Sequence, residues 1–260
     1  MAGTALSYGG NSLQTANIVI ENIDHHSVPT ITATQYPIDH DNQSIIPYVN
    51  YPSKKITVTG YVYSLISIAD CDAQIDTFKS LLTGIDLPLV VGYNNSSRTY
   101  YATVTDVTIT RPGGLLYAPF TITFLCDLPF GQDPNPTVAW NVTSQTTQPL
   151  SASFNFTGTA PYQLPIATIT YSGTLSGGTN AAVIFSNAGT GQQITVTRTW
   201  SSGDVLVIDC TQKTVTVNGI PTAFTGAFPQ FTPGSQQMEY SDGFSARTVA
   251  INVSYTANYL

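Results

Sequence analysis

The chain has 260 residues, a formal net charge of −7 and charged side chains at only 9% of its positions. Globular proteins usually carry about a quarter, and so few Lys and Glu argue against many exposed helices, which such side chains normally coat. Residues 1–53 contain no Lys or Arg. This argues against nucleic-acid binding through a basic patch and fits an acidic surface that either keeps the chain soluble or repels passing DNA.

Four runs in the first half alternate apolar and polar residues or are rich in β-branched side chains. They cover residues 17–23, 55–65, 100–111 and 118–128. Both patterns are typical of strands, so we expect an N-terminal domain built on a sheet.

One segment of this half follows a helical period instead. Apolar side chains recur there at spacings of four, three and four residues, which places them on one helical face. They are Cys71, Ile75, Phe78 and Leu82. The pattern predicts a helix from about residue 71 to 82 lying across the sheet, with Asp70 as its N-cap and Gly84 at the C′ position.

Pro134 and Pro136 interrupt the chain after the fourth run, because proline breaks helices and strand ladders. We expect a boundary here, between domains of residues 1–132 and 133–260. The second half consists of short strand-like runs separated by turn signals, which is typical of a β-sandwich. The predicted fold class is all-β with one helix: an N-terminal β-barrel or sandwich with a packed helix, then a C-terminal β-sandwich.

The stretch "SGDVLVIDCTQKTVTVNGIP" (202–221) places a cysteine, two aspartates and a lysine within twenty residues. The alternation on either side of "TQK" predicts a hairpin with Leu206, Ile208 and Cys210 on one face. Asn218-Gly219 predicts a second tight turn, because both residues tolerate positive φ. A reactive cysteine needs a nearby His or a helix N-terminus, so we favour the hairpin over a reactive site.

Other candidates for chemistry are weak. The clusters "DHH" (24–26) and "DHD" (39–41) hold all three histidines and have metal-ligand chemistry, but two solvated loop ends are the simpler interpretation. No nucleophile-elbow motif or phosphate loop is present. We expect no catalysis, no metal site and no cofactor. We also expect the cysteines to be reduced and buried, since no signal peptide is evident.

Aromatic residues suggest one alternative. Trp140, Trp200 and fifteen tyrosines could stack on sugar rings, as in lectins built on sandwiches. Aromatic residues more often pack cores and interfaces.

The order of motifs resembles the distal tail proteins of long non-contractile-tailed bacteriophages. The first half carries "PSKKITVTGYV", "DAQIDTFKSLLTG" and "RTYYATVTDVTITRPGGLLYAPFTITFLCDLPFG". The second carries "SGDVLVIDCTQKTVTVNG", "FPQFTPGSQQMEY" and "INVSYTANYL". The resemblance covers most of residues 50–260 and depends on the order and spacing of these motifs together.

This resemblance implies a galectin-like C-terminal sandwich and a hexameric ring at the distal end of the tail. It implies a virion structural protein of the tail tip, assembled in the bacterial host cytoplasm, that is not an enzyme. The implied partners are further copies of the chain, the tail tube protein, a tail-tip or tail-associated hub protein and receptor-binding proteins. DNA would pass through the lumen without specific nucleic-acid binding, and no membrane would be involved.

A ring needs apolar surfaces that are buried only in the oligomer. The segment "SIIPYVNYP" (44–52) is more apolar than a free loop requires. Its candidate interface residues are Ile45, Ile46, Tyr48 and Tyr51; filling the core of the monomer is the alternative. Two other functions stay open, a carbohydrate-binding module or adhesin that contacts host glycans and an enzyme with an unrecognised carboxylate pair.

Overall fold

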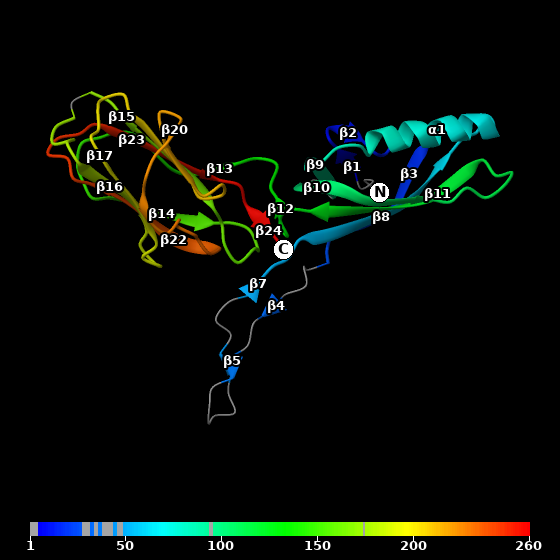
Figure 1. Ribbon diagram of the computed structural model, residues 1–260, viewed down its shortest axis with the longest axis horizontal. Coiled ribbons are helices and arrows are strands. Elements are labelled where there is room, and N and C mark those ends of the chain that lie inside the picture. Colours follow the sequence, from blue (N-terminus) through cyan, green and yellow to red (C-terminus); the bar gives the residue numbers. More distant parts are fainter. Residues whose placement is uncertain are drawn as a thin grey trace. The chain divides into compact units, whose positions relative to one another are not determined.

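The computed structural model describes residues 5–27, 32–33, 36–37, 44–45, 49–93, 96–173 and 175–260 (Figure 1). Contacts group the chain into two compact units. The N-terminal unit comprises Met1–Pro134 and Leu260, and the C-terminal unit comprises Asn135–Tyr259. Each unit has a hydrophobic core of its own.

The N-terminal unit is built on one antiparallel sheet. Its long strands are β8 (Lys54–Tyr63), β10 (Ser96–Ile109) and β11 (Tyr117–Cys126). Its shorter strands are β1 (Ala5–Tyr8), β2 (Asn11–Ser12), β3 (Ile18–Asp24), β9 (Leu87–Tyr93) and β12 (Gly131–Gln132). The order is β2-β1-β9-β10-β11-β8-β3, with β12 paired to β10. All four predicted strands are present, with ends shifted by four residues or fewer.

Two short strand pairs complete the described strands of this unit. They are β4 (Thr32–Ala33) with β7 (Val49–Asn50), and β5 (Tyr36–Pro37) with β6 (Ser44–Ile45).

Alternation along the long strands gives the sheet one buried face and one partly exposed face. In β8, Ile56 and Val58 are fully buried, whereas Thr57 and Thr59 are partly exposed. This is the two-residue period of a strand with one side on a core.

Helix α1 (Ile68–Leu81) lies across the buried face of the sheet (Figure 1). The side chains predicted to form its inner face, Cys71, Ile75, Phe78 and Leu82, are all buried. The rings of Phe78 and Phe120 pack with their centroids 4.6 Å apart. The predicted helical face is therefore confirmed. No helix in the described part of the chain has the length and apolarity needed to cross a bilayer.

The ends of the helix differ from the prediction. It begins three residues before residue 71, and its N-cap is Ser67, not Asp70. Ser67 has the extended backbone that an N-cap requires, and its Oγ accepts the Asp70 N–H at 3.1 Å. Asp70 lies in the first turn, where its carboxylate suits the positive end of the helix dipole. The C-cap is Leu82, so Gly84 lies one residue beyond the expected C′ position, with φ +128°.

The C-terminal unit consists of two antiparallel sheets. In strand order, the first contains β13 (Thr137–Gln145), β23 (Val249–Tyr255), β15 (Pro165–Tyr171), β18 (Val205–Asp209), β19 (Thr214–Val217) and β20 (Ile220–Pro221). The second contains β14 (Leu150–Phe156), β22 (Gly234–Asp242), β16 (Ala181–Asn187), β17 (Gln193–Arg198) and β21 (Thr225–Gly226). The two-residue strand β24 (Asn258–Tyr259) follows β23.

Side chains from both sheets form the core of this unit. Phe156 of β14 packs on Tyr255 of β23, with ring centroids 4.7 Å apart, and stacks on Phe231 at 4.8 Å. All three side chains are buried. The sheets therefore pack as a sandwich, and the predicted fold class, all-β with one helix, is confirmed.

The stretch 202–221 forms the expected hairpin. Strands β18 and β19 pair from Leu206↔Val217 to Asp209↔Thr214, and Leu206, Ile208 and Cys210 are fully buried. Asn218 and Gly219 have φ of +54° and +76°, as the tight turn between β19 and β20 requires.

One ion pair is buried in the C-terminal unit. Arg247 Nε lies 2.8 Å from Asp242 Oδ2, and both side chains are almost completely excluded from solvent. The Tyr240 hydroxyl donates to the same carboxylate at 2.7 Å, and burial raises the pKa of Tyr240 well above its usual value. These groups satisfy one another, so they stabilise the unit and form no reactive site.

Candidate functional site

The predicted interface segment is described only in part. Ile46 and Tyr48 lie outside the described residues, and Ile45 is described only as a backbone position in β6. Tyr51 is partly exposed, and its ring lies 5.5 Å from that of the buried Phe130. The choice of these four residues as an interface therefore stays a prediction.

The histidines do not form the arrangement that a metal site would need in the described part of the chain. Strand β3 ends before His25 and His26, and the centroids of their rings lie 3.8 Å apart. His25 is buried, contrary to the expected solvated loop end, and its carbonyl accepts from Lys54 Nζ at 2.6 Å. The second cluster, residues 39–41, lies outside the described residues. Within the described ranges no three His, Cys, Asp or Glu side chains converge on a possible ion.

The cysteines have the surroundings of core residues. Cys71, Cys126 and Cys210 are buried and unbridged. Burial raises the pKa of the Cys126 and Cys210 thiols to about 12. Neither forms an appreciable thiolate at neutral pH, which is what nucleophilic chemistry would require.

The tryptophans do not provide a surface for sugar. Trp140 and Trp200 are only 7% and 4% exposed. The Trp200 indole donates to the Ala181 carbonyl at 2.9 Å, and its ring packs on Tyr171. Neither ring is open to a sugar in this fold, so the carbohydrate alternative loses the two tryptophans that helped to suggest it.

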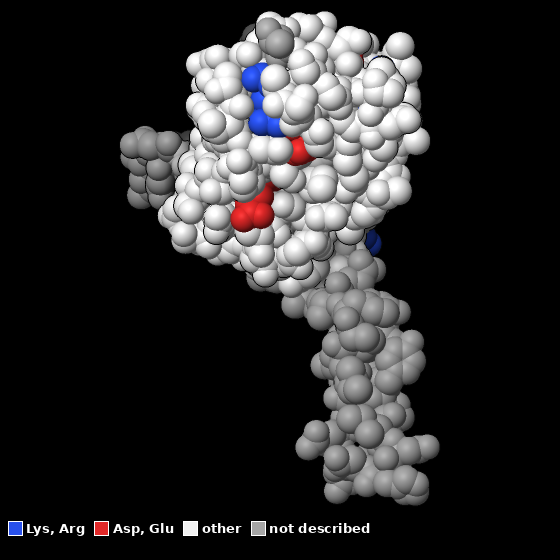
Figure 2. All heavy atoms as spheres, turned by 90° about the vertical axis from the view of Figure 1, so that its left-hand side faces the viewer, with Lys and Arg blue, Asp and Glu red and all other residues white. Residues whose placement is uncertain are grey.

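Figure 2 shows one face of the C-terminal unit, on which charged side chains form only small separate groups. This matches the low charge content of the chain. A polyanion such as DNA would find no extended basic surface on this face.

The N-terminal unit exposes a group of large apolar side chains at one end of its sheet, which we call the apolar tip. Leu65 and Ile66 are the most exposed, at 86% and 81%. The tip comprises Leu65, Ile66 and Ile68, around the connection from β8 to α1, and Leu115, Leu116 and Tyr117, around the connection from β10 to β11. The two connections lie side by side, because the Ser64 N–H donates to the Leu116 carbonyl at 2.9 Å.

Hydrogen bonds hold the first connection of the apolar tip in one conformation. The Ser64 hydroxyl donates to the Asp70 carboxylate at 2.6 Å and accepts the Ile66 N–H at 3.0 Å. Ser67 caps the helix that follows. Leu65 and Ile66 are therefore presented to solvent by a structured turn, so a partner would pay little conformational entropy to bind them.

The sequence interpretation missed the apolar tip. It placed Leu65 inside a strand, and β8 ends two residues earlier, at Tyr63. Two features of the sequence could have revealed the apolar tip: the cluster "LISI" (65–68) directly before a helix, and the cluster "LLY" (115–117) after two glycines. A run of exposed apolar residues of this kind marks an interaction site more often than a free surface.

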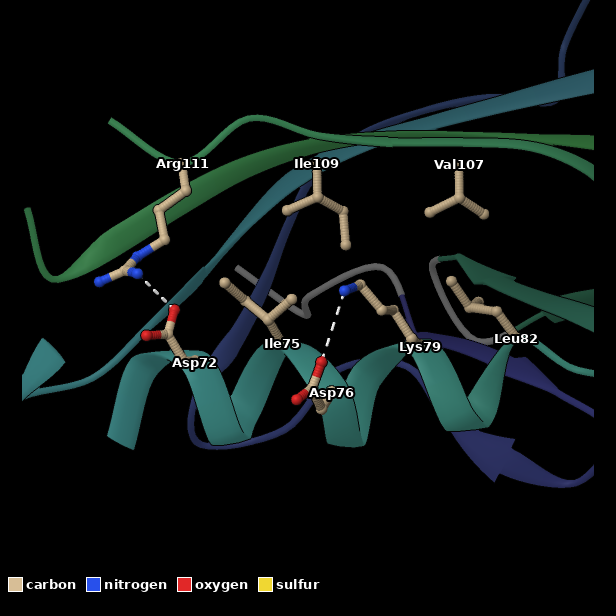
Figure 3. Close-up of a pocket in the computed structure, with 8 residues that line it drawn as sticks. All are labelled: Asp72, Ile75, Asp76, Lys79, Leu82, Val107, Ile109 and Arg111. Atoms are coloured by element: carbon tan, nitrogen blue, oxygen red, sulfur yellow. Dashed lines mark hydrogen bonds and ion pairs between the residues drawn. The ribbon is translucent and has the colours of Figure 1, made fainter. Parts of the chain in front are cut away.

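A pocket of about 670 Å³ lies between α1 and β10 (Figure 3). Ile75 of the helix and Leu82, the C-cap, face Val107 and Ile109 of the strand across it. These apolar side chains form the floor of the pocket. Its size falls within the range of ordinary binding pockets.

The charged residues around this α1–β10 pocket are paired with one another. Arg111 Nη1 lies 2.5 Å from Asp72 Oδ1, and Lys79 Nζ lies 3.4 Å from Asp76 Oδ1 (Figure 3). The Arg111 Nε–H is buried and has no hydrogen-bond partner among the described residues. The pocket thus has an apolar floor, a rim whose charged side chains pair with one another, and one hydrogen-bond donor, the Arg111 Nε–H, without a partner among the described residues. These properties suit an uncharged ligand that carries a carbonyl group.

Comparison with known proteins places this geometry in context. Residues 157–259, which lie within the C-terminal unit, match the family model described as the C-terminal domain of the siphovirus-type tail component. No curated protein matches the sequence significantly.

Among solved structures, the chain is similar to the Dit protein of phage SPP1, described as a paradigm of the hub adsorption apparatus in phages that infect Gram-positive bacteria. The TM-score is 0.69 at 18% identity, and the match covers 99% of this chain and 100% of that protein. A chain of the activated baseplate of phage P2 with calcium matches with a TM-score of 0.46 at 13% identity, over 99% of this chain and 98% of that one. The resemblance to the distal tail proteins is thus confirmed, by sequence in the C-terminal unit and by a fold shared with SPP1 Dit along the whole chain.

Proposed function

We propose that this protein is the structural hub at the distal end of a siphophage tail. Six copies form a ring that joins the tail tube to the tip or baseplate proteins. The observation that carries the proposal is the fold shared with SPP1 Dit over 99% of this chain and 100% of that protein. The proposed role is structural and not catalytic. The proposed location is the virion tail tip, after assembly in the host cytoplasm.

The proposed partners are the tail tube protein above the ring, a tail-tip hub protein below it and receptor-binding proteins. DNA passes through the lumen of the ring. The net charge of −7 and the lack of Lys and Arg in residues 1–53 support this, because a surface without cations does not retain a polyanion.

We propose that the C-terminal unit is a galectin-like sandwich with an architectural role. The burial of Trp140 and Trp200 supports a role other than sugar binding. Residues 44–52 remain a proposed part of the ring contact. Of the four candidate residues, Tyr51 is the one whose side chain is described, and it packs on Phe130.

The solution mass of the purified protein, measured by light scattering over a range of concentrations, tests the ring. We expect a species near six times the chain mass of 27.8 kDa and six-fold rings in negative-stain electron micrographs. Gold-labelled antibodies against the protein should bind at the distal end of the tails. Labelling of the capsid or of the tail shaft would contradict the proposed location.

A further inference from the structure

We propose that the apolar tip of one copy inserts into the α1–β10 pocket of the next copy. Tip and pocket would then be the two halves of one contact between subunits. This inference rests on the proposed ring and adds the surfaces that hold it together.

The apolar tip has the properties of an interface anchor. Leu65 and Ile66 project from a turn held by the Ser64 and Ser67 hydrogen bonds, so they form a rigid projection and not a disordered loop. Exposing several adjacent aliphatic side chains to water is unfavourable in proportion to the apolar area exposed. Burial against a partner removes this cost, and rigid apolar anchors at the centre of a contact supply most of its affinity.

The α1–β10 pocket has the properties of a receptor for this projection. Its floor is apolar, and Val107 is an exposed valine at one end of it (Figure 3). A volume of about 670 Å³ has room for more than one aliphatic side chain. Leu65 and Ile66 do not fill the pocket of their own chain, since both are more than four-fifths exposed.

Charge also favours this guest. The carboxylates of the rim are already paired with Arg111 and Lys79, so a charged guest would compete with existing ion pairs. The residues of the apolar tip carry no charge and leave these pairs intact. A backbone carbonyl of the inserted turn would give the buried Arg111 Nε–H the partner that it lacks among the described residues.

The proposed occupant is a second copy, because the described part of each chain carries both an apolar projection and an apolar pocket that can receive it. Contacts between two different surfaces of identical chains are heterologous, and such contacts form a ring when the repeated rotation returns to the first subunit. If the apolar tip bound another tip, the contact would be isologous and would stop at a dimer.

Two variants of the full chain separate the two surfaces. Leu65→Asp with Ile66→Asp alters the apolar tip at positions too exposed to affect the core. Val107→Glu places a charge on the floor of the pocket. The matched control is Ile220→Asp, an isoleucine of the C-terminal unit that is 68% exposed. Circular dichroism checks that each variant is folded.

Light scattering should show the wild-type ring and an unchanged ring for Ile220→Asp. Each of the other variants alone should be monomeric, with subunit association weakened by about 100-fold or more. An equimolar mixture of the tip and pocket variants should form a one-to-one heterodimer, because one intact tip and one intact pocket remain between them. A variant that combines Ile66→Cys with Val107→Cys should form disulfide crosslinks between neighbouring copies on oxidation.

The outcomes separate this inference from the proposed function. A tip variant that still forms six-fold rings at wild-type concentrations, or a mixture without heterodimer, overturns the tip-and-pocket contact and leaves the ring standing. A two-subunit species that both variants break supports the contact and rejects the six-fold ring. A wild-type chain that stays monomeric at every concentration overturns both.

Discussion

The two units bury their apolar side chains to different extents. In the C-terminal unit, two sheets cover each other, and large exposed apolar residues such as Val138, Ile166 and Ile220 lie on different strands. In the described part of the N-terminal unit, the main sheet is covered on one face by one helix, and apolar side chains gather on two adjacent connections. A sandwich satisfies its own apolar surface, whereas one sheet with one helix leaves surface for partners.

Under the proposed function, this difference suggests that the two units have different roles. The C-terminal unit would be stable by itself, and the N-terminal unit would supply the contacts of the assembly. Fluorescence can follow the two units separately, because both tryptophans of the chain, Trp140 and Trp200, lie in the C-terminal unit.

Truncating the core of the C-terminal unit should have the largest effect on stability. Phe156→Ala removes a buried ring that contacts Phe231 and Tyr255, and we expect the free energy of unfolding to fall by about 3–5 kcal/mol. Urea denaturation followed by tryptophan fluorescence measures this loss. Phe224→Ala, at a side chain that is 38% exposed, is the control and should change stability far less.

The corresponding truncation in the N-terminal unit should leave the tryptophan signal unchanged. Phe78→Ala weakens the packing of α1 on the sheet, and we expect the free energy of unfolding of this unit to fall by about 3 kcal/mol. This is the lower end of the usual range, because the outer side of the helix faces solvent and the helix can move to fill part of the cavity. Hydrogen exchange of the helix amides reports this loss. A matching shift in the fluorescence transition would show that the two units unfold together, and would contradict their independent stability.

Removing the N-cap of α1 should have a smaller effect. Ser67→Ala deletes the acceptor of the Asp70 N–H and should cost about 1 kcal/mol. Ser80→Ala, at an exposed position inside the same helix, is the matched control and should be neutral or slightly stabilising. Faster amide exchange in the first turn of the helix for Ser67→Ala alone would confirm the cap. Equal effects of the two substitutions would contradict it.

Acidification should destabilise the N-terminal unit through His25, and this is the smallest effect that we expect. Burial lowers the pKa of His25 in the folded chain, and the nearby His26 and Lys54 lower it further. Between that value and the ordinary pKa of about 6.5, the unfolded chain binds more protons, so stability falls as the pH falls through this window.

The comparison of wild type with His25→Gln isolates this contribution, because carboxylates titrate in both proteins. The stability of the N-terminal unit, measured by hydrogen exchange between pH 7 and pH 5, should fall less in the variant. An equal fall in the two proteins would assign the pH dependence to other groups.

Local periodicity predicted most elements of the fold. The spacing of Cys71, Ile75, Phe78 and Leu82 identified the buried face of α1, and Asn218-Gly219 identified a tight turn. The cap of the helix was misassigned, because Ser67 and Asp70 are both good caps in isolation. The choice between them depends on backbone angles.

The candidate site was less accessible to sequence reasoning. Leu65 was assigned to a strand, and Val107 and Ile109 resemble any other alternating strand residues. The rim of the pocket includes Arg111 and Asp72, which are 39 positions apart in the chain and meet as an ion pair. No pattern within either segment indicates that contact.

The sequence by itself determined the strands, the helix, the turns and the shortage of basic residues, because these depend on composition and on side chains a few positions apart. The tertiary structure decided which apolar side chains stay in water. Exposure depends on contacts between distant segments, such as the hydrogen bond from Ser64 to Leu116 that brings the two connections of the apolar tip together. The same holds for Trp140 and Trp200. The sequence left sugar stacking and core packing as alternatives for them, and the fold buries both side chains in the core.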